Sequence, residues 1–265
     1  MTHPEPAPKN PAYNRASKQN LSDPKPALSP SPDAVCRIFD SIAPYYVLLN
    51  HILSFGWDFI WRRKLANIVN KDKKLQVLDL ATGTGDLLIS LLRRNPNITE
   101  AVGLDISENM LALCRDRIAK HKLTDRTTLV RSDAADSGLP DESFDLVTMG
   151  FGIRNTPDAS KTLCEIHRLL RQGGTALILE FSLPSNRIIR KIYLLYLRNF
   201  VPMLGSLLSG DKNAYRYLNT SVENFYSMDD FSNLMRKAGF FDVNTIPLTF
   251  GVACIYKASK VSTGL

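Results

Sequence analysis

The chain has 265 residues, and its 33 Lys and Arg against 26 Asp and Glu give a formal net charge of +7. With 44% hydrophobic residues, this is the composition of a globular protein. The longest uncharged run, residues 41–57, is shorter than the roughly 20 apolar residues that a membrane-spanning helix needs. No basic patch followed by an apolar core opens the chain, so we expect no secretory signal and a cytosolic protein.

The 4 cysteines and 4 histidines are scattered, without a C-x-x-C pair or a ligand-like spacing. This argues against a disulfide framework and against a metal site. The excess positive charge is spread along the chain in short clusters. Two interpretations stay open: an ordinary solvated surface, or attraction to anionic lipid or nucleic acid.

The first 32 residues hold eight of the 15 prolines and few apolar residues. Such a segment cannot bury a core, so we predict a disordered tail over residues 1–32. A helical pattern follows over residues 33–70, with breaks near Pro44 and near residues 54–56. We therefore expect the folded domain at residues 33–260, beginning with N-terminal helices.

From residue 75 onward, short apolar runs alternate with helical periodicity. This alternation requires crossover connections, which build a parallel sheet covered by helices on both faces. The loops that follow such strands are where ligands bind. The predicted strands are 76–80, 101–104, 128–131, 144–149 and 175–181, and the predicted helices are 86–94, 108–121 and 159–170.

The C-terminal part departs from this alternation. Residues 186–210 are apolar and basic, and a polar stretch containing tyrosines continues to residue 226. A helix is predicted at 228–238, and strands at 242–246 and 252–257 are joined by a tight reversal, which favours an antiparallel pair. The expected fold is α/β: a doubly wound, mostly parallel, seven-stranded sheet with an antiparallel C-terminal strand and extra helices.

The sharpest local signal is residues 77–86, an apolar strand that runs into a Gly-x-Gly turn and then a helix. Gly83 and Gly85 let the backbone approach a ligand closely. A dinucleotide-binding turn wants a third glycine, but Leu88 stands there, and Asp86 at the helix start would repel a pyrophosphate. S-adenosylmethionine therefore fits better than NAD, with a plain structural turn as the remaining alternative.

Two carboxylates end the neighbouring strands. Asp105 closes the second strand, where its oxygens can accept hydrogen bonds from the two hydroxyls of a ribose. Asp133 closes the third strand and can accept from an adenine amino group, although an aspartate there is as often a cap or turn residue.

Several segments together resemble the ubiquinone/menaquinone biosynthesis C-methyltransferases, which belong to the class I S-adenosylmethionine-dependent methyltransferases. The resemblance extends from about residue 35 to residue 257. The Gly-x-Gly turn alone supports only the superfamily, and the later segments narrow it to the family. The segments are Phe39–Tyr46 with Asn50, Ser54–Gly56, Asp79–Asp86, Phe151–Asn155, Leu179–Ser182 and Tyr215–Leu218.

The resemblance implies a Rossmann-like methyltransferase domain that binds S-adenosylmethionine. Two positions depart from the family pattern: Val47 stands where Asp is common, and Gly150 stands where Ser is common, so Gly150 offers only its backbone. Residues 186–226 are then expected to form a lid over the substrate, with plain packing against the sheet as the alternative. The implied cofactor-binding residues are Gly83, Thr84, Gly85, Asp105, Asp133, Ala134 and Gly150.

The implied reaction is C-methylation of a polyprenyl quinol, most directly demethylmenaquinol to menaquinol. Arg154 and Asn155 follow the fourth strand, where cofactor and substrate meet, so Arg154 can stabilise a developing phenolate and Asn155 can orient a water. The alternative is a structural ion pair for Arg154 and a helix cap for Asn155. His51 is a weaker candidate base, and four tyrosines can bracket an aromatic ring: Tyr45, Tyr46, Tyr215 and Tyr217.

The sequence is also compatible with other functions and partners. The basic charge favours a nucleic-acid methyltransferase, but residues 150–152 replace the Asn/Asp-Pro-Pro-aromatic box of enzymes that methylate a flipped base, so we expect no nucleic-acid partner. A non-catalytic scaffold that binds cofactor within a quinone-synthesis complex is the other alternative. Peripheral contact with the inner face of the membrane, other quinone-biosynthesis proteins and a second copy of the chain are the remaining candidate partners.

Overall fold

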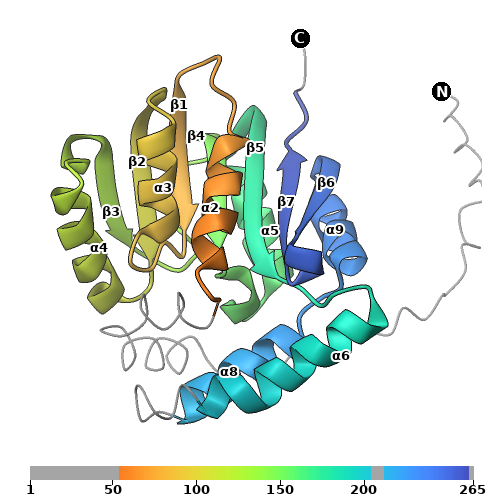
Figure 1. Ribbon diagram of the computed structural model, residues 1–265. Coiled ribbons are helices and arrows are strands. Elements are labelled where there is room, and N and C mark those ends of the chain that lie inside the picture. Colours follow the sequence, from red (N-terminus) through yellow and green to blue (C-terminus); the bar gives the residue numbers. More distant parts are fainter. Residues whose placement is uncertain (1–53, 204–211, 263–265) are drawn as a thin grey trace, which may run out of the picture.

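The structure is a computed structural model that describes residues 54–203 and 212–262 (Figure 1). The predicted tail and most of the predicted N-terminal helices, residues 1–53, lie outside the described residues. The last of those helices is α2 (Trp57–Asn67). It begins after Gly56, whose backbone is left-handed with φ of 74°, a conformation that glycine adopts at no steric cost.

The predicted sheet is confirmed, with seven strands in the order β3-β2-β1-β4-β5-β7-β6. β1 to β5 are parallel, and β7 runs antiparallel to both β5 and β6. The carboxyl ends of the parallel strands therefore share one edge, the lower edge in Figure 1. The strands are β1 (Leu75–Leu80), β2 (Ile98–Asp105), β3 (Thr127–Arg131), β4 (Phe144–Gly150), β5 (Leu170–Phe181), β6 (Phe241–Leu248) and β7 (Ala253–Ser259).

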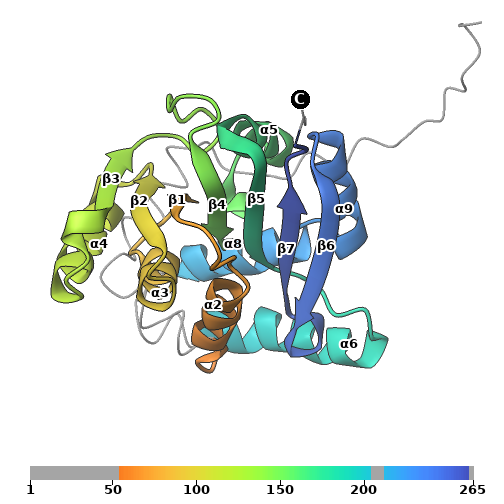
Figure 2. The same ribbon diagram turned by 90° about the horizontal axis from the view of Figure 1, so that it is seen from above.

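Helices cover both faces of the sheet (Figure 2). One buried cluster joins the sheet to α2, α3 (Asp86–Arg94) and α4 (Glu108–Lys120). A second cluster joins it to α5 (Ala159–Leu169) and α9 (Met228–Lys237). The strands of the sheet interior read as nearly continuous apolar runs because both of their faces are buried.

The largest difference from the predicted elements is the length of β5, which begins at Leu170 rather than at residue 175. The helical pattern suggested that α5 continues through Leu170, but that residue has an extended backbone and pairs with Phe144 of β4. The reversal before β7 is the short turn η5 (Thr249–Gly251), slightly later than predicted. Pairing with a neighbouring strand decides both boundaries, and the local pattern does not contain that information.

The segment after β5 leaves the sheet. It forms α6 (Arg187–Leu195), which continues into the π-helical turn η4 (Tyr196–Phe200), and after an interval α8 (Lys212–Glu223). These helices lie across the carboxyl edge of the sheet (Figure 1). A small buried cluster, Leu197, Val201 and Val222, joins them to each other.

Candidate functional site

The turn between β1 and α3 has the backbone geometry that its glycines predict. Gly83 and Gly85 have φ of 55° and 81°, in the left-handed region that disfavours other residues. A Cβ built on Gly85 would lie 2.6 Å from the sulfur of Cys114, because α4 packs against the turn. Gly85 is thus required by packing, while the space beside Gly83 is open.

Asp105 is fixed at the end of β2 by backbone donors. The N–H of Gly83 donates to its Oδ2 at 2.8 Å, and the N–H of Ser107 donates to its Oδ1 at 2.9 Å. Ser107 in turn caps α4 by accepting from the N–H of Met110. The carboxylate is therefore held between the Gly-x-Gly turn and the start of α4, at the edge of a cavity.

That cavity, of about 790 Å³, lies at the carboxyl edge of the sheet, at the ends of β1 to β4. We call it the edge pocket. Thr84 and Gly85 are buried behind it, and Thr84 donates its hydroxyl to Asp86. Six of the predicted site residues line the edge pocket: Gly83, Asp105, Asp133, Ala134, Gly150 and Asn155.

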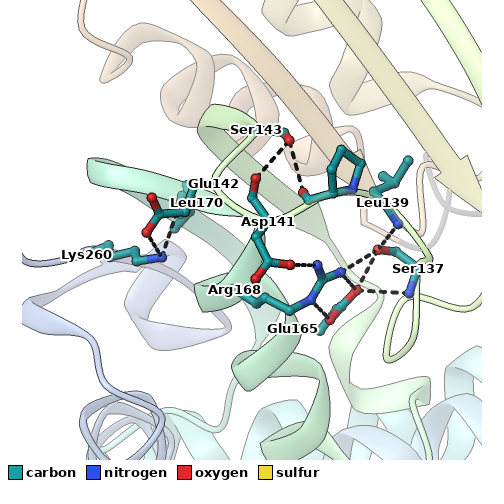
Figure 3. Close-up of polar contacts among 10 residues, drawn as sticks. Ser137, Leu139, Asp141, Glu142, Ser143, Glu165, Arg168, Leu170 and Lys260 are labelled. Atoms are coloured by element: carbon teal, nitrogen blue, oxygen red, sulfur yellow. Dashed lines mark hydrogen bonds and ion pairs between the residues drawn. The ribbon is translucent and has the colours of Figure 1, made fainter.

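The loop after β3, which carries Asp133 and Ala134, is held by a polar network of Ser137, Glu165 and Arg168 (Figure 3). Arg168 of α5 donates to Glu165 at 2.6 Å and also pairs with Asp141. Glu165 accepts from both the N–H and the hydroxyl of Ser137, at 2.9 and 2.5 Å. The hydrogen bond from Arg168 lowers the pKa of Glu165 to about 2. The loop is therefore braced against α5 at two points.

Asp79 lies beneath the turn, on the face of β1 that looks toward α3. Its carboxyl is buried and accepts from the hydroxyls of Thr148 at 2.6 Å and Thr82 at 2.7 Å. Burial raises the pKa of Asp79 to about 6, despite these two hydrogen bonds. The Asp79 carboxyl beneath the turn therefore titrates well above the usual range of aspartates.

A second cavity, of about 980 Å³, lies between the sheet edge and the helices α2, η4 and α8. We call it the aromatic pocket. Phe151 lines both cavities, and its ring lies 4.6 Å from that of Phe181 and 5.3 Å from the guanidinium of Arg62. The aromatic side chains around the pocket are Phe55, Trp57, Trp61, Phe151, Phe181, Tyr193 and Tyr196.

Arg154 and Asn155 are neighbours in sequence but line different cavities. Arg154 faces the aromatic pocket, and Asn155 lines the edge pocket. Both donate to the carbonyl of Phe151, at 2.7 and 3.2 Å, and so hold that residue in a left-handed backbone conformation with φ of 58°. The pair therefore flanks the boundary between the two cavities.

The guanidinium of Arg154 is buried in an ion pair. It donates to Glu180 of β5 at 2.7 Å, and the side chains are 5% and 0% exposed. Its Nε has no hydrogen-bond partner within the described part of the chain. The ion pair of the structural alternative for Arg154 is therefore present. The helix cap predicted for Asn155 is wrong, because Asp158 caps α5 by accepting from the N–H groups of Ser160 and Lys161.

The tyrosines that line the aromatic pocket, Tyr193 and Tyr196, are not among those that the sequence singled out. Tyr217 donates its hydroxyl to Asn155 at 3.2 Å. Tyr193 and Tyr196 were missed, although both follow the basic, apolar pattern of residues 186–210, and burial raises the pKa of Tyr196 to about 12. The structure does not describe Tyr45, Tyr46, His51 or the side chain of Tyr215.

The edge pocket fits a nucleoside with a small polar extension. Asp105 supplies anionic acceptors at one side, Leu104 and Met110 supply apolar walls, and the open backbone at Gly83 admits close approach. In the described ranges, no three His, Cys, Asp or Glu side chains gather as metal ligands would. No helix in those ranges is long and apolar enough to cross a membrane.

Comparison with known proteins agrees with this geometry. Residues 28–260 match the ubiE/COQ5 methyltransferase family. The chain is 41% identical over 233 residues to the ubiquinone/menaquinone biosynthesis C-methyltransferase UbiE of Geobacter sulfurreducens, covering 88% of this chain and 91% of that protein. It is 44% identical over 221 residues to the demethylmenaquinone methyltransferase of Thermotoga maritima, covering 83% and 93%.

Solved structures are similar in fold. A SAM-dependent methyltransferase from Thermotoga maritima aligns with a TM-score of 0.60 at 19% identity, covering 85% of this chain and 99% of that one. Another from Aquifex aeolicus aligns with a TM-score of 0.56 at 17% identity, covering 76% and 89%. The chain belongs to the ubiE/COQ5 methyltransferase family and is an S-adenosylmethionine-dependent C-methyltransferase.

Proposed function

We propose that this enzyme methylates a ring carbon of a polyprenyl quinol, with demethylmenaquinol as the acceptor and menaquinol as the product. The observation that carries the proposal is the aromatic pocket, which shares Phe151 with the edge pocket. A planar, apolar ring fits a cavity walled by aromatic side chains. The names of the relatives, which specify demethylmenaquinone or both quinone pathways, support the same class of acceptor.

In this proposal the edge pocket holds S-adenosylmethionine, which supplies an electrophilic methyl group on a sulfonium. Asp105 accepts from the ribose hydroxyls, and Asp133 accepts from the adenine amino group. Ala134 and Gly150 present small surfaces that leave room for the ligand. Thr84 and Gly85 are buried behind the edge pocket. They fix the shape of the turn and do not contact the cofactor directly.

Arg154 and Asn155 provide the chemical assistance. A quinol hydroxyl has an aqueous pKa near that of phenol, about 10, and loss of its proton makes the ring carbon more nucleophilic. Arg154 stabilises the developing phenolate through its buried guanidinium, whose Nε carries an unused donor. Asn155, positioned by Tyr217, orients a water that carries the proton away. The main contribution of the protein is to align the ring carbon with the methyl group.

We also propose that residues 186–226 form a lid over the substrate and that the enzyme acts at the inner face of the membrane. The helices α6 and α8 lie across the carboxyl edge of the sheet and contribute walls of the aromatic pocket. A polyprenyl chain is confined to the bilayer by its apolar length. An enzyme without a spanning helix in its described ranges must then meet its acceptor at the membrane surface.

Transfer of labelled methyl to two acceptors, measured side by side, tests the proposal. Demethylmenaquinol is expected to accept the label, and the methoxy-polyprenyl-benzoquinol is the comparison substrate. The Asp105→Ala variant is the control for transfer that depends on the edge pocket. Binding of S-adenosylmethionine without transfer to either quinol would contradict the proposal and favour a non-catalytic scaffold.

A further inference from the structure

A third cavity, outside both pockets, is rich in arginine. It is a groove of about 1,100 Å³ over the outer side of α3, with α2 and α4 as its walls. Asp86 is the one carboxylate in its lining. The basic side chains of this arginine groove are Arg62, Arg63, Arg93, Arg94, Arg117 and His121.

Two of these five arginines are already engaged. Arg117 donates to Asp86 at 2.5 Å and to the carbonyl of Thr84 at 2.8 Å, and buried Arg62 pairs with Asp58. Asp86, the carboxylate in the lining, is thus already paired. The arginine groove therefore keeps a net positive charge that comes from its remaining members.

The remaining arginines are Arg63, Arg93 and Arg94, whose side chains form no hydrogen bond or ion pair in the described structure. Arg63 and Arg93 are exposed, and Arg94 is half-buried. Three like charges gathered in one groove repel each other unless an anion lies between them. The planar guanidinium matches the oxygens of a phosphate in a bidentate manner, so a phosphate monoanion or diester is the ligand class that this arrangement suits.

The wall formed by α2 is apolar and open to solvent. Phe59 and Ile60 line the groove with exposed fractions of 56% and 52%, and Trp57, one turn earlier, is 44% exposed. Large apolar side chains beside unpaired arginines are the combination with which peripheral proteins enter the headgroup region of a bilayer. A free phosphate would use the arginines but leave these apolar side chains in water.

We propose that the arginine groove binds the phosphate of an anionic phospholipid at the membrane surface, with Phe59 and Ile60 entering the headgroup region. This inference rests on the proposed function, which requires an acceptor drawn from the bilayer. Arg62 lines both the arginine groove and the aromatic pocket. Docking at the groove therefore places the membrane beside the pocket that receives the quinol ring.

Vesicle flotation of the full chain tests the proposal, with phosphatidylcholine vesicles compared with vesicles that also contain phosphatidylglycerol. The groove variant is Arg63→Gln/Arg93→Gln/Arg94→Gln. The matched control, Lys161→Gln/Arg236→Gln/Lys237→Gln, removes the same charge from exposed positions on α5 and α9, on the opposite face of the sheet. Melting temperatures of all three proteins verify folding.

The wild type is expected to bind the vesicles that contain phosphatidylglycerol. The groove variant should lose about tenfold or more in that affinity, whereas the control should stay close to the wild type. Equal losses in both variants would mean attraction by overall charge and would overturn the proposal. The variant Phe59→Ser/Ile60→Ser should also bind vesicles more weakly. An unchanged affinity would contradict the proposal that the groove binds a lipid.

Inorganic phosphate and single-stranded RNA serve as competing probes. If the wild type binds either of them through the groove arginines but does not float with vesicles, the phospholipid is the wrong ligand. Methyl transfer to a quinol with a truncated prenyl chain, measured without vesicles, should be the same in the groove variant and the wild type. Absence of that transfer in the wild type would contradict the proposed function, independently of the flotation result.

Discussion

The edge pocket and the aromatic pocket touch at Phe151 but are assembled in opposite ways. The edge pocket is built from the loops directly after β1, β2, β3 and β4, so its walls come from one edge of one sheet. The aromatic pocket collects side chains from α2, β5, η4, α8 and η5, which are spread from residue 54 to residue 252. A site at the strand ends follows from topology, whereas a site between added helices depends on how they pack.

The two pockets also differ in the chemistry of their walls. Around the edge pocket, carboxylates and backbone N–H groups are held by short hydrogen bonds and by the brace on α5. The aromatic pocket is walled by rings and contains one buried ion pair, Arg154 with Glu180. Changes at Arg154 should therefore act on turnover, and changes at Asp105 should act on cofactor binding. Four experiments test this division.

The largest effect is expected from Arg154→Ala, which should lower turnover by about a hundredfold or more and leave cofactor affinity nearly unchanged. A donor that stabilises charge only in the transition state is worth roughly 3 kcal/mol. Turnover, cofactor affinity and melting temperature are measured on one preparation. A stability loss with normal activity per folded molecule would show that Arg154 is only structural.

The buried partner complicates that variant, because removing Arg154 leaves Glu180 with an unpaired buried charge, which typically costs about 3 to 5 kcal/mol. The double variant Arg154→Met/Glu180→Gln removes the charge as well and should recover much of the stability. Turnover should stay low in the double variant. The single Glu180→Gln variant, which keeps the guanidinium, is the matched control.

Asp79→Asn should change how stability depends on pH. Because the pKa of Asp79 rises from 3.8 to about 6 on folding, the folded state prefers the protonated form. The free energy of unfolding therefore falls as pH rises from about 4 to about 6, by about 3 kcal/mol from this group. Melting curves of cofactor-free protein should show a weaker pH dependence in the variant. The exposed Asp116→Asn is the control, and equal slopes in wild type and Asp79→Asn would contradict the assignment.

Asp105→Ala should reduce cofactor affinity at least about tenfold. The substitution removes two charge-assisted hydrogen bonds to the ribose, each worth about 1.5 to 3 kcal/mol. It also frees the N–H groups of Gly83 and Ser107, so Asp105→Asn is the milder companion. Calorimetry that gives an unchanged dissociation constant would exclude Asp105 from the cofactor site.

The smallest effect is expected from deletion of residues 1–32. Their proline density and lack of apolar periodicity predict no contribution to the core. The shortened protein should keep its melting temperature and its turnover on a soluble, short-chain quinol. A loss of either would mean that this segment docks on the folded domain.

Much of the edge pocket could be predicted because local spacing determines it. A strand, a Gly-x-Gly turn and an acidic residue at the next strand end are all visible in the sequence, and parallel pairing brings them to one edge. Gly83 and Asp105 are examples. Thr84 is not on the lining, because the turn directs its hydroxyl back to Asp86.

The aromatic pocket could be predicted only in outline. Arg154 and Asn155 lie in the 3-10 turn η3 (Ile153–Asn155), where successive side chains point about 120° apart, so they enter different cavities. The ion pair with Glu180 depends on the pairing of β4 with β5, in which Gly150 lies opposite Leu179. Such contacts are between segments far apart in the chain, and no local pattern specifies them.

The single ring of Phe151 has a thermodynamic consequence. It borders both pockets, and its carbonyl is bonded by Arg154 and Asn155. A ligand that shifts the ring in one pocket would change the shape of the other, so we expect the binding of cofactor and the binding of acceptor to be coupled. Linkage makes this effect reciprocal: the factor by which bound cofactor changes acceptor affinity equals the factor by which bound acceptor changes cofactor affinity. Substitution of Phe151 is therefore expected to change the affinities for both ligands.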